Sequence, residues 1–174
     1  MTQEEVMNAH RRYQNQFGEG KRPHEDVTPT IEQLSSLKHL IESGESPFVS
    51  FAVWKPNAQR NMKRQKFTGK LFNTRCKLVD TELAGPPTFE HFKQCYKVLQ
   101  TALIMLGAVD LGNVTQYLEY LEDFHRRFGE PLYALLFQAD TRARSELMAR
   151  LDQDAYAAYY KVGVTGQDSR QLAL

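Results

Sequence analysis

The sequence predicts an α+β fold, in which a small antiparallel sheet of two or three strands is followed by a mainly helical C-terminal three-helix bundle. Apolar residues alternate with other residues over 48–83, and they recur at spacings of three and four over 88–160. A break rich in Gly and Pro, "AGPPT", separates the two regions. The 174 residues, 41% apolar and 25% charged, have the composition of one globular domain.

The ends of the chain are polar. Residues 1–27 contain Gly18, Gly20 and Pro23 and only scattered apolar residues, so we expect a flexible N-terminal arm. From Gly163 onward the residues are small and polar, and we expect a flexible tail over 161–174. The single α+β domain is therefore predicted to span residues 28–160.

The domain is predicted to begin with a helix over residues 28–43. Thr28 can cap this helix and Pro29 suits its first position, while Gly44 is a plausible stop. One apolar stripe runs along it: Ile31, Leu34, Leu37, Leu40 and Ile41.

Strands are predicted between residues 48 and 83. The stretch "PFVSFAVW" is rich in β-branched and aromatic residues and ends at Pro56. A second strand follows in "QKFTGKLF", with Phe67 and Leu71 on one face, and a third in "TRCKLVDTEL". Asn73-Thr74 is the predicted turn between the last two strands.

Three helices are predicted over residues 88–160. Thr88 caps the first and Gly107 ends it; Asn113 caps the second and Gly129 ends it; Pro131 opens a long third helix that reaches about Tyr160. Because their connections are short, we expect antiparallel neighbours packed as a bundle.

Charge is segregated along a chain whose net charge is only +1. The segment "KPNAQRNMKRQKFTGKLFNTRCK" (residues 55–77) holds eight basic residues and no acidic one, whereas residues 80–130 hold eight acidic and four basic residues. Cations neutralise phosphates and aromatic rings stack on unpaired bases, so this segment predicts binding to RNA or DNA. The candidate nucleic-acid-binding residues are Trp54, Lys55, Arg60, Lys63, Arg64, Lys66, Lys70, Arg75 and Lys77.

Two other interpretations of the basic segment stay open. Its cations could pair with the acidic helical segment, either of the same chain or of a neighbouring copy in a homo-oligomer. They could also be solvated residues that protect the edges of a small sheet.

No pattern in the sequence requires a catalytic or metal site. His91 and Cys95, four residues apart on a predicted helix, lie near Glu90 and Cys76, but structural zinc needs four ligands and no Cys-x-x-Cys supplies the rest. Glu122, Asp123 and His125 offer acid–base groups, although a salt-bridged solvated helix face explains them better. We predict a protein that is not an enzyme and has no cofactor.

Favourable helical ion pairs are predicted near the C-terminal end of the domain. Asp140 precedes Arg144 by four residues, and Glu146 precedes Arg150 by four. The alternative interpretation is an arginine face, formed by Arg142, Arg144 and Arg150, that docks a partner.

Two stretches, "SPFVSFAVWKPNAQR" and "LGAVDLGNVTQYLEYLEDFHRRFGEPLYALLFQADTRARSELMARL", carry a resemblance to a known kind of segment. Residues 28–151 resemble an uncharacterised Gag-like segment of protist retroelement (retrotransposon) polyproteins, and Phe137–Glu146 is the most distinctive part. The resemblance implies a structural protein that binds nucleic acid or assembles. It supplies no functional residues, and the chain has no zinc knuckle.

The leading hypothesis is thus a non-catalytic protein of retroelement origin that binds a phosphate backbone through residues 55–77. The second is a homo-oligomeric scaffold that pairs basic and acidic faces between copies, and the third is an enzyme using Glu122, Asp123 and His125. The longest apolar run, "ALIMLGAV", is too short for a membrane helix, and the N-terminus lacks the apolar core of a secretory signal. We therefore expect no membrane association and an intracellular location, cytoplasmic or nuclear.

Overall fold

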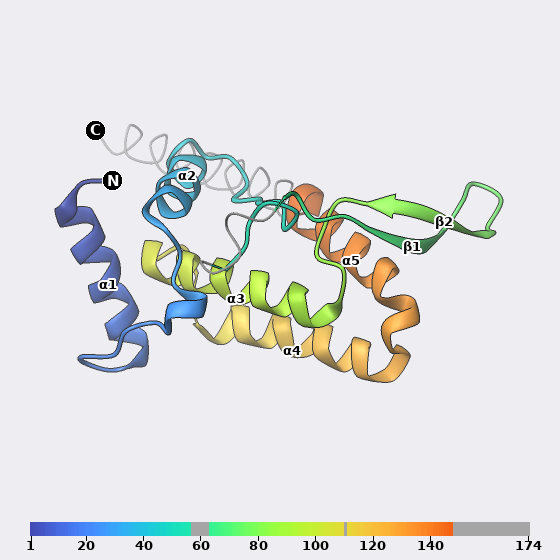
Figure 1. The fold of residues 1–174 in the computed structure, drawn as a ribbon. Helices are drawn as coiled ribbons and strands as arrows, with labels where there is room; N and C mark the ends of the chain where they lie inside the picture. Colours follow the sequence, from blue (N-terminus) through green and yellow to red (C-terminus); the bar gives the residue numbers. More distant parts are fainter. Residues whose placement is uncertain (57–62, 110, 148–174) are drawn as a thin grey trace, which may run out of the picture.

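The structure is a computed structural model that describes residues 1–56, 63–109 and 111–147. Five α-helices and a two-stranded antiparallel sheet form it, which confirms the predicted α+β class and the helical C-terminal part. Helices α3 and α4 lie side by side, α1 and α2 lie at one end and above, and the hairpin projects from the other end (Figure 1).

Residues 1–27 do not form the predicted flexible arm. Helix α1 (Gln3–Phe17) occupies most of this segment and packs on α3, with Ala9 fully buried between them. A capping box closes its N-terminus: the Glu5 amide donates to Thr2 Oγ1, and the Thr2 amide donates to the Glu5 carboxylate. The arm prediction failed because few residues of α1 are apolar, and only the contact with α3 makes the helix part of the core.

Helix α2 (Ile31–Glu42) confirms the first predicted helix but begins later than expected. Thr30, not Thr28, is its N-cap, and Gln33 completes a capping box with it. The preceding residues instead form a short 3₁₀ turn, η1 (Glu25–Val27). Of the predicted apolar stripe, Leu34 and Leu37 are buried, whereas Ile31 is exposed.

The strand predicted at residues 48–54 is absent. This segment turns, because the amides of Val53 and Trp54 both donate to the Ser50 carbonyl. Phe51 fills the core against Phe92, with ring centroids 5.3 Å apart. Of the aromatic and β-branched residues that predicted a strand, Phe51 and Trp54 are core side chains of an irregular segment, whereas Val53 is exposed.

The other two predicted strands are confirmed. Strand β1 (Phe67–Phe72) pairs with β2 (Leu78–Leu83) in an antiparallel register that places Phe67 opposite Leu83 and Phe72 opposite Leu78. Asn73 begins the turn as predicted: its side-chain oxygen accepts from the amides of Arg75 and Lys77.

Helix α3 (Phe89–Leu106) is the central element of the core. Thr88 caps it and Gly107 ends it in the left-handed conformation, both as predicted. Helix α4 (Leu111–Phe128) begins two residues before the predicted cap, Asn113. The interface between α3 and α4 includes a hydrogen bond from the Tyr96 hydroxyl to the Val114 carbonyl, 3.1 Å long.

The third helix of the predicted bundle is shorter and less regular than expected. A 3₁₀ turn, η3 (Glu130–Leu132), leads into α5 (Tyr133–Arg142), and a π-helical turn, η4 (Ala143–Leu147), follows. Helix α5 packs on α4 and on β1, so the three helices do pack together. The predicted helix beyond residue 147 and the predicted tail over 161–174 lie outside the described residues.

Candidate functional site

The β1–β2 hairpin carries the C-terminal part of the predicted basic segment, residues 67–77. Its base is fixed to α5: Phe67 packs on Tyr133 and Phe137, with centroids 5.4 and 5.6 Å apart. Gly69 permits this approach, since a Cβ built on it would lie 2.3 Å from Ala134 Cβ. The far end of the hairpin extends away from the helices (Figure 1).

Two of the predicted nucleic-acid-binding residues are buried, so the prediction was wrong for them. Lys55 is 2% exposed, and its ammonium donates to the Lys63 carbonyl at 2.6 Å. Trp54 is 6% exposed and belongs to the core cluster. Neither side chain is accessible to a phosphate or a base. A third predicted residue, Arg60, lies outside the described residues.

Two further lysines of the segment face carboxylates across the hairpin. Cross-strand partners share a face of the sheet, so Lys70 stands beside Asp80. Lys66, just before β1, forms an ion pair with Glu82 at 2.7 Å. The predicted pairing of the basic segment with acidic residues of the same chain therefore exists here, but with β2 rather than with the helices.

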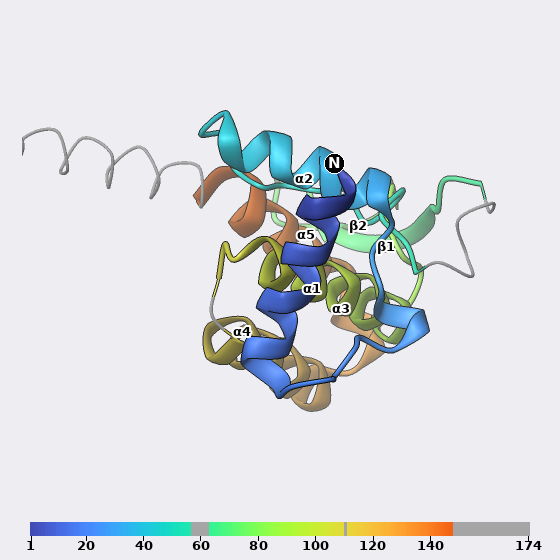
Figure 2. The ribbon, with the colours of Figure 1, turned by 90° about the vertical axis from the view of Figure 1, so that its left-hand side faces the viewer.

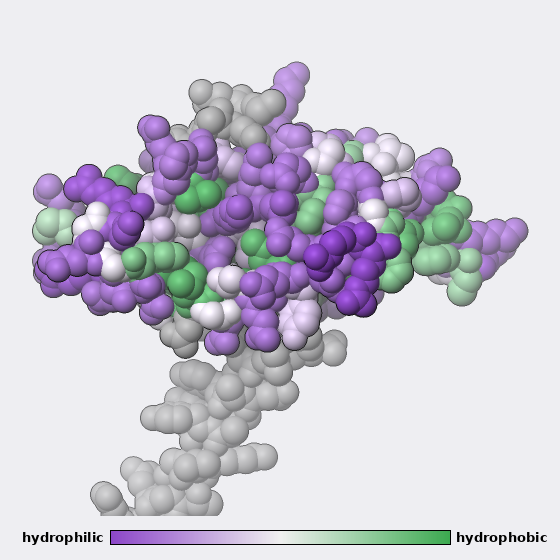
Figure 3. All heavy atoms as spheres, turned by 90° about the horizontal axis from the view of Figure 1, so that it is seen from below, coloured by the Kyte–Doolittle hydropathy of each residue, from purple (hydrophilic) through white to green (hydrophobic). Residues whose placement is uncertain are grey.

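The remaining cations of the segment are exposed and have no acidic partner among the described residues: Lys63 and Arg64 before β1, and Arg75 and Lys77 in the turn. Apolar side chains are exposed beside them, with Phe72 at 60%, Leu78 at 49% and Val79 at 40%. Figure 3 shows these apolar residues gathered on the projecting hairpin, with hydrophilic residues beyond them. We call Phe72, Arg75, Lys77, Leu78 and Val79 the hairpin tip.

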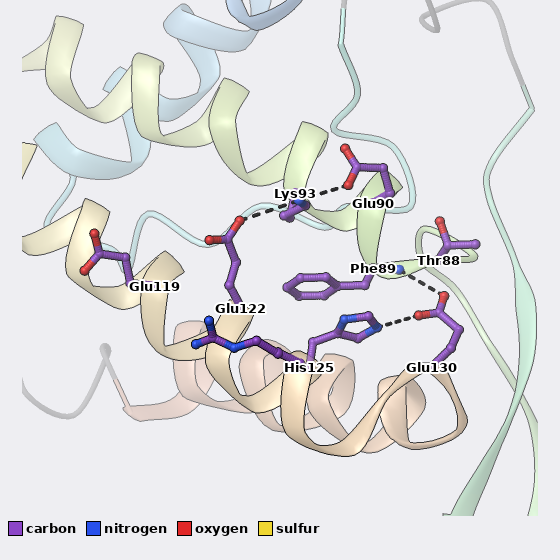
Figure 4. Close-up of a pocket in the computed structure, with 9 residues that line it drawn as sticks. Thr88, Phe89, Glu90, Lys93, Glu119, Glu122, His125 and Glu130 are labelled. Atoms are coloured by element: carbon purple, nitrogen blue, oxygen red, sulfur yellow. Dashed lines mark hydrogen bonds and ion pairs between the residues drawn. The ribbon is translucent and has the colours of Figure 1, made fainter.

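An open groove between α3 and α4 is the second candidate site, with a volume of about 710 Å³. Four carboxylates line it, together with His125 and two cations, Lys93 and Arg126 (Figure 4). His125 stacks on Phe89, with centroids 4.2 Å apart, and its Nε2 lies 2.6 Å from the Glu130 carboxylate. Glu130 also accepts from the Phe89 amide, which ties the end of α4 to the start of α3. We call this the acidic groove; its glutamates are Glu90, Glu119, Glu122 and Glu130.

The three residues of the enzyme hypothesis do not converge. Glu122 contacts Lys93, and His125 contacts Glu130. Asp123 does not line the groove; it pairs with Arg126 and Arg127, and the hydrogen bond from Arg126 lowers the pKa of its carboxyl. The sequence analysis missed Glu130, although its position five residues after His125, just past Gly129, could have suggested the contact.

The residues considered for a metal are separated. Cys95 is fully buried in α3, and burial raises the pKa of its thiol to about 12. Cys76 lies exposed in the hairpin turn, and His91 contacts the Thr88 hydroxyl at 2.7 Å. In the described part of the chain, no group of three His, Cys, Asp or Glu side chains is placed to hold a metal ion.

The predicted ion pair between Asp140 and Arg144 is present but buried. Two guanidinium nitrogens donate to one carboxylate oxygen at 2.8 and 2.9 Å, and Tyr117 donates to the other at 2.9 Å. Arg144 also donates to the Val49 carbonyl and lies over the Phe51 ring. This arrangement excludes Arg144 from a docking face, and Arg142 pairs with Glu146 instead; Arg150 lies outside the described residues.

No protein-family model, curated protein or solved structure matches this chain. Within the residues that the structure describes, no helix combines the length and the apolar character that a membrane span requires.

Proposed function

We propose that this chain is a non-catalytic nucleic-acid-binding protein and that the hairpin tip is its main contact surface. The observation that carries this proposal is the exposure of Phe72 beside two cations, Arg75 and Lys77, which have no acidic partner among the described residues. Cations bind phosphates, and an exposed aromatic ring stacks on an unpaired base. The expected ligand is therefore single-stranded RNA or DNA.

Lys63 and Arg64, which are exposed just before β1, offer two further cations near the base of the hairpin. Lys66 and Lys70 contribute less to the proposed site, because Glu82 and Asp80 offset their charge. The segment thus offers a strand of nucleic acid two groups of free cations, one before β1 and one in the turn.

Retroelement origin belongs to the proposal on the sequence resemblance alone. The most distinctive residues of that resemblance include Phe137, Asp140 and Arg144, and all three are buried. Their burial explains them as residues that hold the fold together, so the binding proposal rests on the hairpin and not on them.

The test measures the affinity of the purified, nuclease-treated protein for fluorescein-labelled oligo(dT) and oligo(rU) of 20 nucleotides, by anisotropy over a salt series. We expect Lys77→Glu to weaken binding and to reduce the slope of log K against log salt by about 0.7, the value of one phosphate contact on a single strand. Lys97→Glu is the matched control, because Lys97 is an exposed lysine on α3. Equal effects of the two substitutions would refute a binding surface on the hairpin.

A second pair of variants tests whether the Phe72 ring stacks on a base. Phe72→Ala should cost about 1–3 kcal/mol of binding free energy, as loss of one stacked base does. Tyr120→Ala removes another exposed aromatic ring, on α4, and should leave affinity unchanged. If Phe72→Ala binds as the wild type does, the ring is not a stacking platform.

Self-assembly is the second candidate function, and the acidic groove is the observation that favours it. Four glutamates line this groove against two cations, Lys93 and Arg126, so its carboxylates exceed its cations and could receive Arg75 and Lys77 of another copy. Size exclusion with light scattering, run at low and high salt, gives the mass of the particle. The 260/280 nm absorbance ratio of the same peak shows whether nucleic acid is bound, so the two measurements distinguish nucleic-acid binding from self-assembly. A large, salt-sensitive mass with a protein-like ratio would support assembly, whereas a monomer at both salts would contradict it.

A further inference from the structure

A second surface with unpartnered cations lies along α1, at the end of the molecule away from the hairpin. A cleft of about 420 Å³ opens there between the helix and the chain that follows it. Figure 2 shows α1 facing the viewer, with the chain turning at its lower end toward η1. The cleft is lined by Met7, His10, Arg11, Gln14 and Arg22.

The four helical residues of the cleft share one face of α1, because 7, 10, 11 and 14 follow helical spacing. Ala9 is buried against the core on the other side, and Arg12 donates to the Leu106 carbonyl at 3.2 Å. These contacts fix the rotation of the helix and hold the cleft face outward. The sequence analysis overlooked this spacing because it assigned residues 1–27 to a flexible arm.

Arg22 reaches the cleft through a glycine-dependent turn. Gly18 and Gly20 both have positive φ, at +108° and +75°, and the Lys21 amide donates to the Gly18 carbonyl. This turn reverses the chain after α1 and brings Arg22 to the cleft that Arg11 also lines.

The charges of the cleft have no counterion in the described structure. No carboxylate lines it, and neither Arg11 nor Arg22 has a hydrogen bond or ion pair there. Most of the other described arginines do have partners: Arg12 a carbonyl, and Arg126, Arg127, Arg142 and Arg144 carboxylates. Those without partners are the two in the cleft and the two of the basic segment, Arg64 and Arg75.

We infer that this cleft binds a phosphate group, held by Arg11 and Arg22 with His10 and Gln14 as further donors. Guanidinium groups present paired N–H donors that match phosphate oxygens, and two arginines line this cleft with no carboxylate among its lining residues. The cleft volume of about 420 Å³ leaves room for a ligand with more than one phosphate. This inference does not depend on the proposed function, because the hairpin tip lies at the opposite end of the molecule (Figure 1).

The test is a titration of the ¹⁵N-labelled full chain with pyrophosphate, at constant ionic strength, followed by amide chemical shifts. We expect saturable shifts confined to residues 7–14 and 18–22. Arg22→Glu should weaken pyrophosphate binding at least about tenfold, because one charge-assisted contact is lost. Arg22 lies in a loop, so this substitution leaves every helix residue unchanged.

The matched control is Lys21→Glu, which makes the same charge change one residue away, at a position that does not line the cleft. An equal loss of affinity in both variants would show only general attraction of anions and would overturn the inference. So would shifts that do not saturate, or that spread over the whole surface.

A competition experiment identifies the source of the phosphate: unlabelled oligo(dT) is added to the protein with pyrophosphate bound. Displacement of pyrophosphate would assign the cleft to a nucleic-acid backbone. No displacement would assign it to a free phosphorylated molecule. Lys77→Glu changes the hairpin tip and should leave pyrophosphate binding at the cleft unchanged. The hairpin proposal and the cleft proposal can therefore fail independently of each other.

Discussion

The buried ion pair of Asp140 and Arg144 offers the sharpest prediction of stability. The side chains are 0% and 5% exposed, and the pair joins α5 to α4 through Tyr117 and to the segment before β1 through Val49. Arg144→Met keeps the length and helix propensity of the side chain but leaves a buried carboxylate without its cation. Breaking a buried pair in this way costs about 3–5 kcal/mol of unfolding free energy.

The matched control is Arg142→Met, two residues earlier. Arg142 pairs with Glu146 at the same i, i+4 spacing, but those side chains are 69% and 56% exposed. An exposed pair contributes only about 0–1 kcal/mol, so this variant should unfold at nearly the wild-type urea concentration.

The double variant Asp140→Leu/Arg144→Met separates the charge effect from the other contacts. It leaves no uncompensated charge, and it loses the hydrogen bonds to the Tyr117 hydroxyl and the Val49 carbonyl. Both groups are only partly buried, so we expect about 1 kcal/mol for each. The double variant should therefore be more stable than Arg144→Met, although it carries one more substitution.

Urea unfolding followed by circular dichroism measures all four proteins, with the midpoint and slope giving the unfolding free energy. If Arg144→Met lost no more stability than Arg142→Met, the buried pair would not hold these segments together. If the double variant were no more stable than Arg144→Met, the cost would lie in lost side-chain volume and contacts rather than in an uncompensated charge.

Three further predictions follow from the core and the hairpin. Gly69→Ala should lower the unfolding free energy by about 1–3 kcal/mol, because the new methyl group would meet Ala134 in α5. Gly112→Ala is the control, since a Cβ added there would meet no neighbouring side chain within 4 Å. In thermal unfolding this variant should be as stable as the wild type or more stable. Iodoacetamide at pH 8 should alkylate the exposed Cys76 and spare the buried Cys95, because burial raises the pKa of the Cys95 thiol to about 12. Mass spectrometry that found both cysteines modified in the native protein would contradict this prediction. Stability should fall as the pH rises above about 9, because groups with raised pKa keep their protons in the folded state while the unfolded chain releases them. A urea midpoint that stayed constant from pH 8 to 11 would contradict that expectation; the groups concerned are Cys95, Tyr96, Tyr117 and Tyr133.

The elements that sequence analysis located correctly are those whose pattern is local. Thr88, the apolar spacing of α3 and Gly107 together specify that helix from its own residues. The hairpin is equally local, since alternation specifies β1 and Asn73 supplies the turn. Sequence analysis failed where tertiary contacts decide the structure. Helix α1 depends on its contact with α3, and Phe51 adopts an irregular backbone because the core has space for its ring.

The same division applies to the candidate sites. That cations gather between residues 55 and 77 and carboxylates after them follows from residue identity, because charge is a property of each residue. Which of these cations are accessible depends on tertiary packing. Packing buries Lys55, the strand register sets Lys70 beside Asp80, and the turn leaves Lys77 free. Burial and pairing depend on residues distant in the chain, and no local pattern contains that information.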